Sequence, residues 1–134
     1  MRELNDMVKQ ICEGVLDKYA ADFSELNAAI TAGLRVGYCI SDKEKTSKGR
    51  RILGECQKVP EEWQGFAPYD FLITFYEPNL AGKTQEQLTA LAYHELMHAG
   101  AELEEDGTIR TWIIPHDQED FHRVLDRFGS DWSR

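Results

Sequence analysis

The residues with the clearest chemical potential are His94, Glu95 and His98, which lie in the segment His94-Glu95-Leu96-Met97-His98. A helix advances 3.6 residues per turn, so two histidines four positions apart point the same way, one turn apart. Their imidazole nitrogens can then reach one ion at roughly 2.0–2.1 Å each, the distance typical of zinc. Glu95 is turned by about 100° from His94, where it can reach a water molecule bound to that ion. This H-E-x-x-H pattern predicts a zinc site with Glu95 as the general base.

A catalytic zinc site usually has three protein ligands and one open position. His116, which lies 18 residues after His98, is the candidate for the third ligand, because it sits between a predicted strand and the last predicted helix. Such a junction would hold the imidazole firmly. Two carboxylates are alternatives. Glu102 would share the face of His98 if the helix continued that far, and Glu119 lies in the first turn of the last predicted helix.

Other polar residues near this junction have simpler interpretations. His116 itself could be a junction histidine that is hydrogen-bonded to the backbone instead of a metal ligand. His122 fits a surface position beside Asp126. Asp117 is either a plain helix N-cap or a hydrogen-bond acceptor that orients a ligand histidine.

The helix that holds the motif has clear start and stop signals. Thr84 is a good N-cap, and Gln87 three residues later completes a capping-box pattern. Gly100 fits the position just past the C-terminus, where a left-handed conformation is favoured. The predicted helix therefore spans about residues 85 to 99. Its flanking apolar residues would bury it in a core: Leu88, Leu91, Ala92, Leu96 and Ala99. Without a metal, the motif would amount to two partly exposed histidines and a salt-bridging glutamate.

Hydrophobic periodicity places further elements before this helix. Two amphipathic helices are predicted first, over residues 3–19 and 24–30. Leu34–Ile40 and Arg51–Val59 follow as a strand pair joined by a polar turn. Asp70–Tyr76 is the strongest strand of the chain, and its apolar character on both faces is typical of a strand that is covered on both sides.

Two elements are predicted after the motif helix. Thr108–Ile114 is an extended stretch that Pro115 stops. A last helix begins near Asp117 and ends at Gly129, with an apolar face formed by Phe121, Val124, Leu125 and Phe128. The order of elements predicts an α+β fold, in which a small mixed β-sheet packs against the N-terminal helix, the H-E-x-x-H helix and the C-terminal helix.

Composition and charge exclude several classes of protein. With 42% hydrophobic and 29% charged residues, the chain has the composition of an ordinary globular protein. Its length of 134 residues is that of one domain, so we expect a single domain over residues 1–134. The net charge of −9 weighs against nucleic-acid binding. The N-terminus lacks a secretion signal and no run is apolar enough for a membrane span, so we expect a cytoplasmic protein. The three cysteines, an odd number without metal-like spacing, predict reduced thiols.

One segment departs from the acidic character of the chain. It contains Lys43, Lys45, Lys48, Arg50 and Arg51. A solvated hairpin tip with charged shoulders is the simpler interpretation, and a contact site for an acidic partner is the alternative.

The order of these segments resembles a known family. The segment Asp70–Pro78, the H-E-x-x-H helix, the segment Pro115–Phe121 and the pair Phe128-Gly129 are similar to those of the putative phage metallopeptidase family, small H-E-x-x-H domains of phages and prophages. The resemblance covers roughly residues 34 to 132. The position of the third histidine just before a helix is also similar to that in the SprT-type minimal zincins. Because this chain is acidic, a DNA-associated role of those proteins is not transferred to it.

The resemblance implies a minimal zincin-like domain with one Zn²⁺ ion. It implies that His94, His98 and His116 bind the ion and that Glu95 is the base. The predicted function is therefore a zinc-dependent peptidase acting on a peptide or protein substrate. The alternatives are a non-catalytic zinc-stabilised binding module of phage or prophage origin, and an interaction protein that keeps the motif without metal. The presence of Glu95 favours catalysis, because a purely structural site needs no base.

The resemblance also implies where substrate could lie. In zincins the strand before the motif helix often runs along the cleft, so extended substrate could pair with the backbone of Ile73, Thr74 and Phe75. Plain core packing is an equal alternative for that strand. A donor that stabilises the oxyanion should exist, and the candidates by residue type are Tyr69, Tyr76 and Tyr93.

Overall fold

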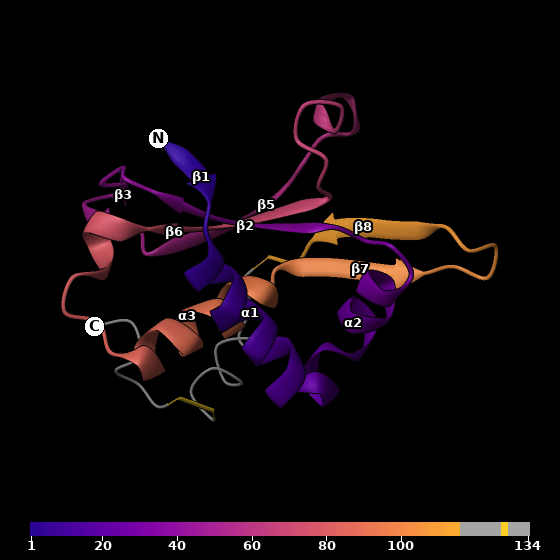
Figure 1. The fold of residues 1–134 in the computed structure, drawn as a ribbon, viewed down its shortest axis with the longest axis horizontal. Helices are drawn as coiled ribbons and strands as arrows, with labels where there is room; N and C mark the ends of the chain where they lie inside the picture. Colours follow the sequence, from indigo (N-terminus) through magenta and orange to yellow (C-terminus); the bar gives the residue numbers. More distant parts are fainter. Residues whose placement is uncertain (116–126, 129–134) are drawn as a thin grey trace.

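The structure is a computed structural model that describes residues 1–115 and 127–128. In this part of the chain a four-stranded mixed sheet, two small two-stranded ribbons and three α-helices form an α+β fold, which confirms the predicted class (Figure 1). The helix predicted from Asp117 lies outside the described residues, apart from Arg127 and Phe128.

The four-stranded sheet is built around strand β6. β6 (Phe71–Tyr76) pairs in parallel with β2 (Val36–Ser41) on one side and antiparallel with β5 (Gly54–Lys58) on the other. β1 (Arg2–Leu4) adds to the outer side of β2, so the order is β1-β2-β6-β5. The apolar run of β6 therefore occupies the interior of the sheet, as expected of a strand covered on both sides.

The predicted pairing of Leu34–Ile40 with Arg51–Val59 is wrong, although both segments contain strands. β2 and β5 are separated in the sheet by β6. The polar segment between them folds instead into its own small hairpin, in which β3 (Thr46–Ser47) pairs with β4 (Arg50–Arg51). Its turn residues, Lys48 and Gly49, have positive φ angles of 52° and 77°, as a tight hairpin turn requires.

The first helices pack against the sheet. α1 (Asp6–Lys18) begins at Asn5, whose side chain accepts a hydrogen bond from the backbone N–H of Val8. The helix is shorter than predicted because Arg2–Leu4 form β1. Its buried stripe consists of Val8, Ile11, Cys12, Val15 and Leu16. A short 3₁₀ turn leads into α2 (Ser24–Thr31), close to its predicted position. Figure 1 shows α1 and α3 together below the sheet.

Helix α3 (Gln85–Leu96) starts as predicted. The Thr84 hydroxyl accepts from the backbone N–H of Gln87, and the Gln87 side chain accepts from the backbone N–H of Thr84. The predicted end of this helix is wrong, because Gly100 lies within strand β7 (Ala99–Leu103).

Gly100 has a different role from the predicted helix stop. β7 pairs with β8 (Ile109–Ile113), and Gly100 lies opposite Trp112. A Cβ atom at Gly100 would be only 2.5 Å from the Trp112 indole, so a glycine is needed for the ring to lie across the ribbon. The Arg110 guanidinium covers the Trp112 ring at 4.9 Å from its centroid.

The described C-terminal residues return to the helices. Phe128 packs edge-on against Tyr93 and Tyr19, and it is buried, as its predicted apolar face requires. Arg127 donates hydrogen bonds to the carboxylate of Asp22. The other residues predicted for that face lie outside the described residues: Phe121, Val124 and Leu125.

Cys12, Cys39 and Cys56 are all free thiols. Across the residues that the structure describes, no helix combines the length and the apolar character needed to cross a membrane.

Gly100→Ala should destabilise the protein by about 1–3 kcal/mol, because the new methyl group overlaps the Trp112 ring. Gly14→Ala is the matched control. Gly14 lies on the exposed face of α1 with no neighbouring atom within 4 Å of its Cβ position, so alanine should stabilise the helix by up to about 1 kcal/mol. Urea denaturation of each variant gives its free energy of unfolding. Equal effects of the two changes would contradict the role assigned to Gly100.

Candidate metal centre

The end of helix α3 keeps three candidate functional side chains together. His94 and Glu95 lie in its last turn, and His98 lies two residues beyond Leu96. The chain stays helical in this stretch, because the backbone N–H of Met97 donates to the Tyr93 carbonyl and that of His98 to the Glu95 carbonyl. The second bond is of the i to i−3 type, which tightens the last turn. His98 therefore remains one turn above His94.

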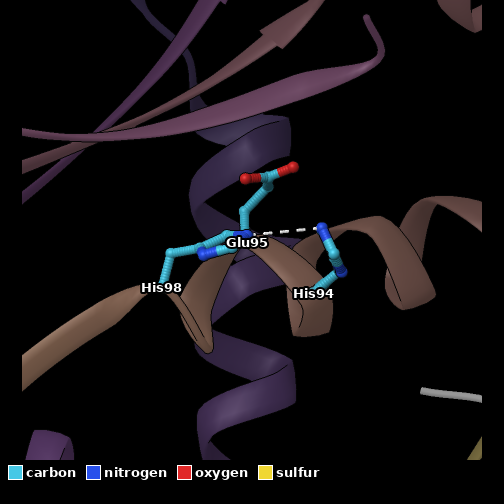
Figure 2. A group of neighbouring side chains, drawn as sticks. All are labelled: His94, Glu95 and His98. Atoms are coloured by element: carbon cyan, nitrogen blue, oxygen red, sulfur yellow. Dashed lines mark hydrogen bonds between the residues drawn. The ribbon is translucent and has the colours of Figure 1, made fainter. Parts of the chain in front are cut away.

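The two imidazoles present the same nitrogen atom to each other. The Nε2 atoms of His94 and His98 are 3.4 Å apart, and their ring planes stand at 86° (Figure 2). Two nitrogens that each lie roughly 2.0–2.1 Å from one tetrahedral zinc ion are about 3.3–3.4 Å apart. The pair therefore fits a shared metal ion without rearrangement of either ring.

The ring of His98 is held in place by Ile114, the residue that follows strand β8. Its Nδ1 atom lies 2.6 Å from the carbonyl oxygen of Ile114, and the backbone N–H of Ile114 donates to the His98 carbonyl at 2.8 Å. A carbonyl can only accept, so Nδ1 must hold the proton and Nε2 keeps its lone pair. This is the usual way in which a protein sets the tautomer of a metal-binding histidine.

Glu95 points toward the sheet, away from the contact between the two rings (Figure 2). The ligand atoms of His94, Glu95 and His98 all lie within 4.8 Å of one another, so this group could hold a metal ion. The Glu95 side chain is only 6% exposed. Burial and, to a smaller extent, the negative charge of Glu55 together raise the pKa of Glu95 to about 8. A divalent cation on the imidazoles would oppose this shift by favouring the carboxylate.

Two residues that position the site were missed by sequence reasoning. Gly54 in β5 lies directly against Glu95, since a Cβ atom there would be 3.4 Å from the Glu95 Cγ atom. A glycine inside a predicted strand is a sign of such close approach. Ile114 acts through its backbone, and only the nearby Pro115, which ends the strand, hints at a special position.

The other predicted ligands have different outcomes. His116 lies outside the described residues, as do Asp117, Glu119 and His122. Glu102 lies in β7, not on a continued helix, and its carboxylate accepts a hydrogen bond from Arg110 on the neighbouring strand. The condition under which Glu102 would share the face of His98 is therefore not met.

The predicted substrate strand is buried. Ile73, Thr74 and Phe75 pair with β2 on one side and β5 on the other, and all three are fully buried. No backbone edge is left for substrate, so the prediction that these residues bind it by strand addition is wrong. The burial of all three arises from the central position of β6.

Two of the tyrosines proposed by type are already engaged. The Tyr76 hydroxyl donates to the Glu55 carboxylate, and the Tyr93 hydroxyl donates to Asp22 at 2.9 Å. In both residues burial is the main cause that raises the pKa of the phenol.

Comparison with known proteins gives one match. The family model described as "Putative phage metallopeptidase" matches residues 2–134. No curated protein and no solved structure matches the chain.

Addition of Zn²⁺ to untagged protein that was first treated with EDTA should raise the melting temperature by several degrees. A ligand at 100 times its Kd stabilises the folded state by about 2.7 kcal/mol. His94→Ala should abolish this shift, because it removes one of the two facing nitrogens. Glu102→Gln is the control and should keep the full shift. A zinc-induced shift that survives in His94→Ala would contradict the assignment of the centre.

Proposed function

The chain belongs to the putative phage metallopeptidase family, and on that premise we propose that it is a zinc-dependent peptidase with a single zincin-like domain. His94 and His98 bind the zinc ion, and Glu95 is the general base. The observation that supports this most strongly is the 3.4 Å separation of two Nε2 atoms, one of which has its lone pair fixed by the Ile114 carbonyl.

His116 is the proposed third ligand. The carbonyl oxygen of Ile114 lies 2.6 Å from the ring of His98, and His116 is only two residues further along the chain. This closeness in sequence to the contact between Ile114 and His98 supports the proposal. An imidazole as the third donor matches the preference of zinc for nitrogen ligands.

The chemistry divides between the metal and Glu95. A zinc ion bound there supplies a Lewis acid that polarises the scissile carbonyl and acidifies water. Glu95 accepts the proton of the attacking water on a carboxylate oxygen and then passes it to the leaving amine. Its burial against β5 supports this role, because a carboxylate shielded from bulk solvent keeps the proton within the site. The two histidines only hold and orient the zinc ion.

The edge strand β5 takes the place that was predicted for Ile73–Phe75. The backbone N–H of Tyr76 donates to the carbonyl of Leu53, and that of Val59 donates to the carbonyl of Asp70. The backbone N–H and C=O groups of the odd-numbered residues in this segment therefore point toward β6. Groups in an antiparallel ladder alternate in direction. The backbone groups of Gly54 and Cys56 therefore face the outer edge, where no other described strand pairs with β5.

An extended substrate paired with this edge would come close to the proposed base. Gly54 lies against Glu95, so a peptide bonded to the backbone of Gly54 and Cys56 runs past the carboxylate. Strand addition of this kind gives affinity through main-chain hydrogen bonds. We assign substrate binding to this edge of β5.

Glu95→Gln should reduce peptide hydrolysis by about 10²–10⁴-fold, since an amide cannot accept the proton. Zinc content should stay near that of the wild type, because neither histidine changes. Cleavage of a fluorescent casein and zinc by atomic absorption are the two measurements. Glu102→Gln, which alters an exposed glutamate on β7, should keep activity. Equal behaviour of Glu95→Gln and wild type on every substrate tried would favour the non-catalytic zinc module.

His116→Ala should weaken zinc binding by at least tenfold and lower hydrolysis, because two nitrogens hold zinc less firmly than three. His122→Ala is the matched control, predicted to be a surface change. Zinc titration against a competing chelator gives the affinity of each variant. Unchanged zinc affinity in His116→Ala would reject this residue as a ligand and leave the other two assignments standing.

A further inference from the structure

The small hairpin before β5 is basic in an otherwise acidic protein. The chain has a net charge of −9, yet four exposed cations lie in this hairpin or just before it: Lys43, Lys48, Arg50 and Arg51. None of the four forms an ion pair within residues 1–115 and 127–128. Glu44 is the acidic residue of this segment. The positive charges of these four side chains are therefore available to a binding partner.

The base of the hairpin is held rigidly. The buried Asn79 side chain donates to the carbonyl of Lys45 at 2.9 Å and to that of Ile52 at 2.8 Å, which joins the two ends of the segment. The Lys45 ammonium pairs with Glu55 at 2.7 Å. The arginines are thus presented from a fixed support, which reduces the entropy lost when they bind.

The hairpin lies at one end of the edge that we assign to substrate. Arg51 precedes Gly54 by three residues, which span at most about 11 Å, and Gly54 lies against Glu95. A substrate that pairs antiparallel with β5 runs from Lys58 toward Gly54. Antiparallel pairs are slightly more stable than parallel ones. The part of the substrate that leaves Gly54 toward Arg51 is then its C-terminal side.

We propose that this hairpin selects acidic residues on the C-terminal side of the cleaved bond, an inference that rests on the proposed peptidase function. Arg50 and Arg51 provide planar donor groups that match carboxylates in geometry. The net negative charge of the remaining protein repels acidic peptides, so the hairpin is the place where such a peptide is attracted. The substrate class is an extended polypeptide with an acidic stretch after the scissile bond.

Three quenched fluorescent peptide libraries test this. All share a randomised centre. One has Asp-Glu-Asp after the centre, one has Asp-Glu-Asp before it, and one has Asn-Gln-Asn after it. The zinc-loaded wild type should cleave the first library roughly fivefold faster than the other two at low salt, as two exposed ion pairs allow. High salt should reduce this preference, because it screens exposed charges.

Arg50→Gln/Arg51→Gln should lower the preference to near onefold. Lys9→Gln/Lys18→Gln is the matched control, since it removes the same charge from the exposed side of α1 and should keep the preference. Cleavage without any acidic preference, or a preference for acidic residues before the centre, overturns the inference. A single-stranded oligonucleotide that binds through these arginines while acidic peptides do not would also overturn it.

Binding measured without cleavage separates this inference from the peptidase proposal. The Glu95→Gln protein can be titrated with labelled peptides of the same sequences, and fluorescence anisotropy reports binding alone. In one outcome, the acidic peptide binds preferentially through Arg50 and Arg51 but the wild type hydrolyses nothing. That outcome would support the role of the hairpin in binding and reject the peptidase function. In the opposite outcome, the wild type hydrolyses peptides but acidic and neutral peptides bind equally well. That outcome would reject the role of the hairpin in selecting substrate and leave the peptidase function standing.

Discussion

The reciprocal pair of hydrogen bonds between His98 and Ile114 is the interaction on which the site depends. His98 lies where α3 has ended and the chain turns into β7, so the helix alone does not fix its ring. Ile114, the residue after β8, supplies both the acceptor for Nδ1 and the donor for the backbone carbonyl. The β7–β8 ribbon, through its tight contact of Gly100 with Trp112, therefore determines which nitrogen faces His94. The arrangement of this candidate metal centre therefore depends on the ribbon as well as on the helical motif.

Much of the site could be predicted from sequence because its signals are local. The capping box of Thr84 and Gln87 placed the start of α3, and the spacing of His94 and His98 needs only helical geometry. The end of α3 could not be predicted in the same way. A glycine serves equally well as a helix stop and as a close-contact point in a strand. At Gly100 the choice is made by Trp112, a contact between strands that no local pattern shows.

The strand order was misjudged for a similar reason. β2 and β5 have the composition of strands, and a polar segment joins them, so a hairpin was the simplest expectation. A parallel pair needs a long connection, and its partners are decided by burial across the whole sheet. β6 can be covered on both sides, whereas β5 is only partly buried, so β6 takes the centre and β5 the edge. The buried Ile73 and Phe75 reflect this competition and not a role in binding.

The proposal that the edge strand β5 serves the sheet, the proposed base and the proposed substrate is consistent with the two ways in which a strand alternates. Its side chains alternate between faces, so Gly54 lies toward Glu95 while Glu55 lies on the opposite face, held by Lys45 and Tyr76. Its backbone groups alternate between edges, so the bonds to β6 leave those of Gly54 and Cys56 for another chain. Glu55 therefore acts on Glu95 only through its charge across the sheet. Gly54 acts through the space that it leaves, since a Cβ atom there would be 3.2 Å from the Leu91 side chain and already in contact with Glu95 at 3.4 Å.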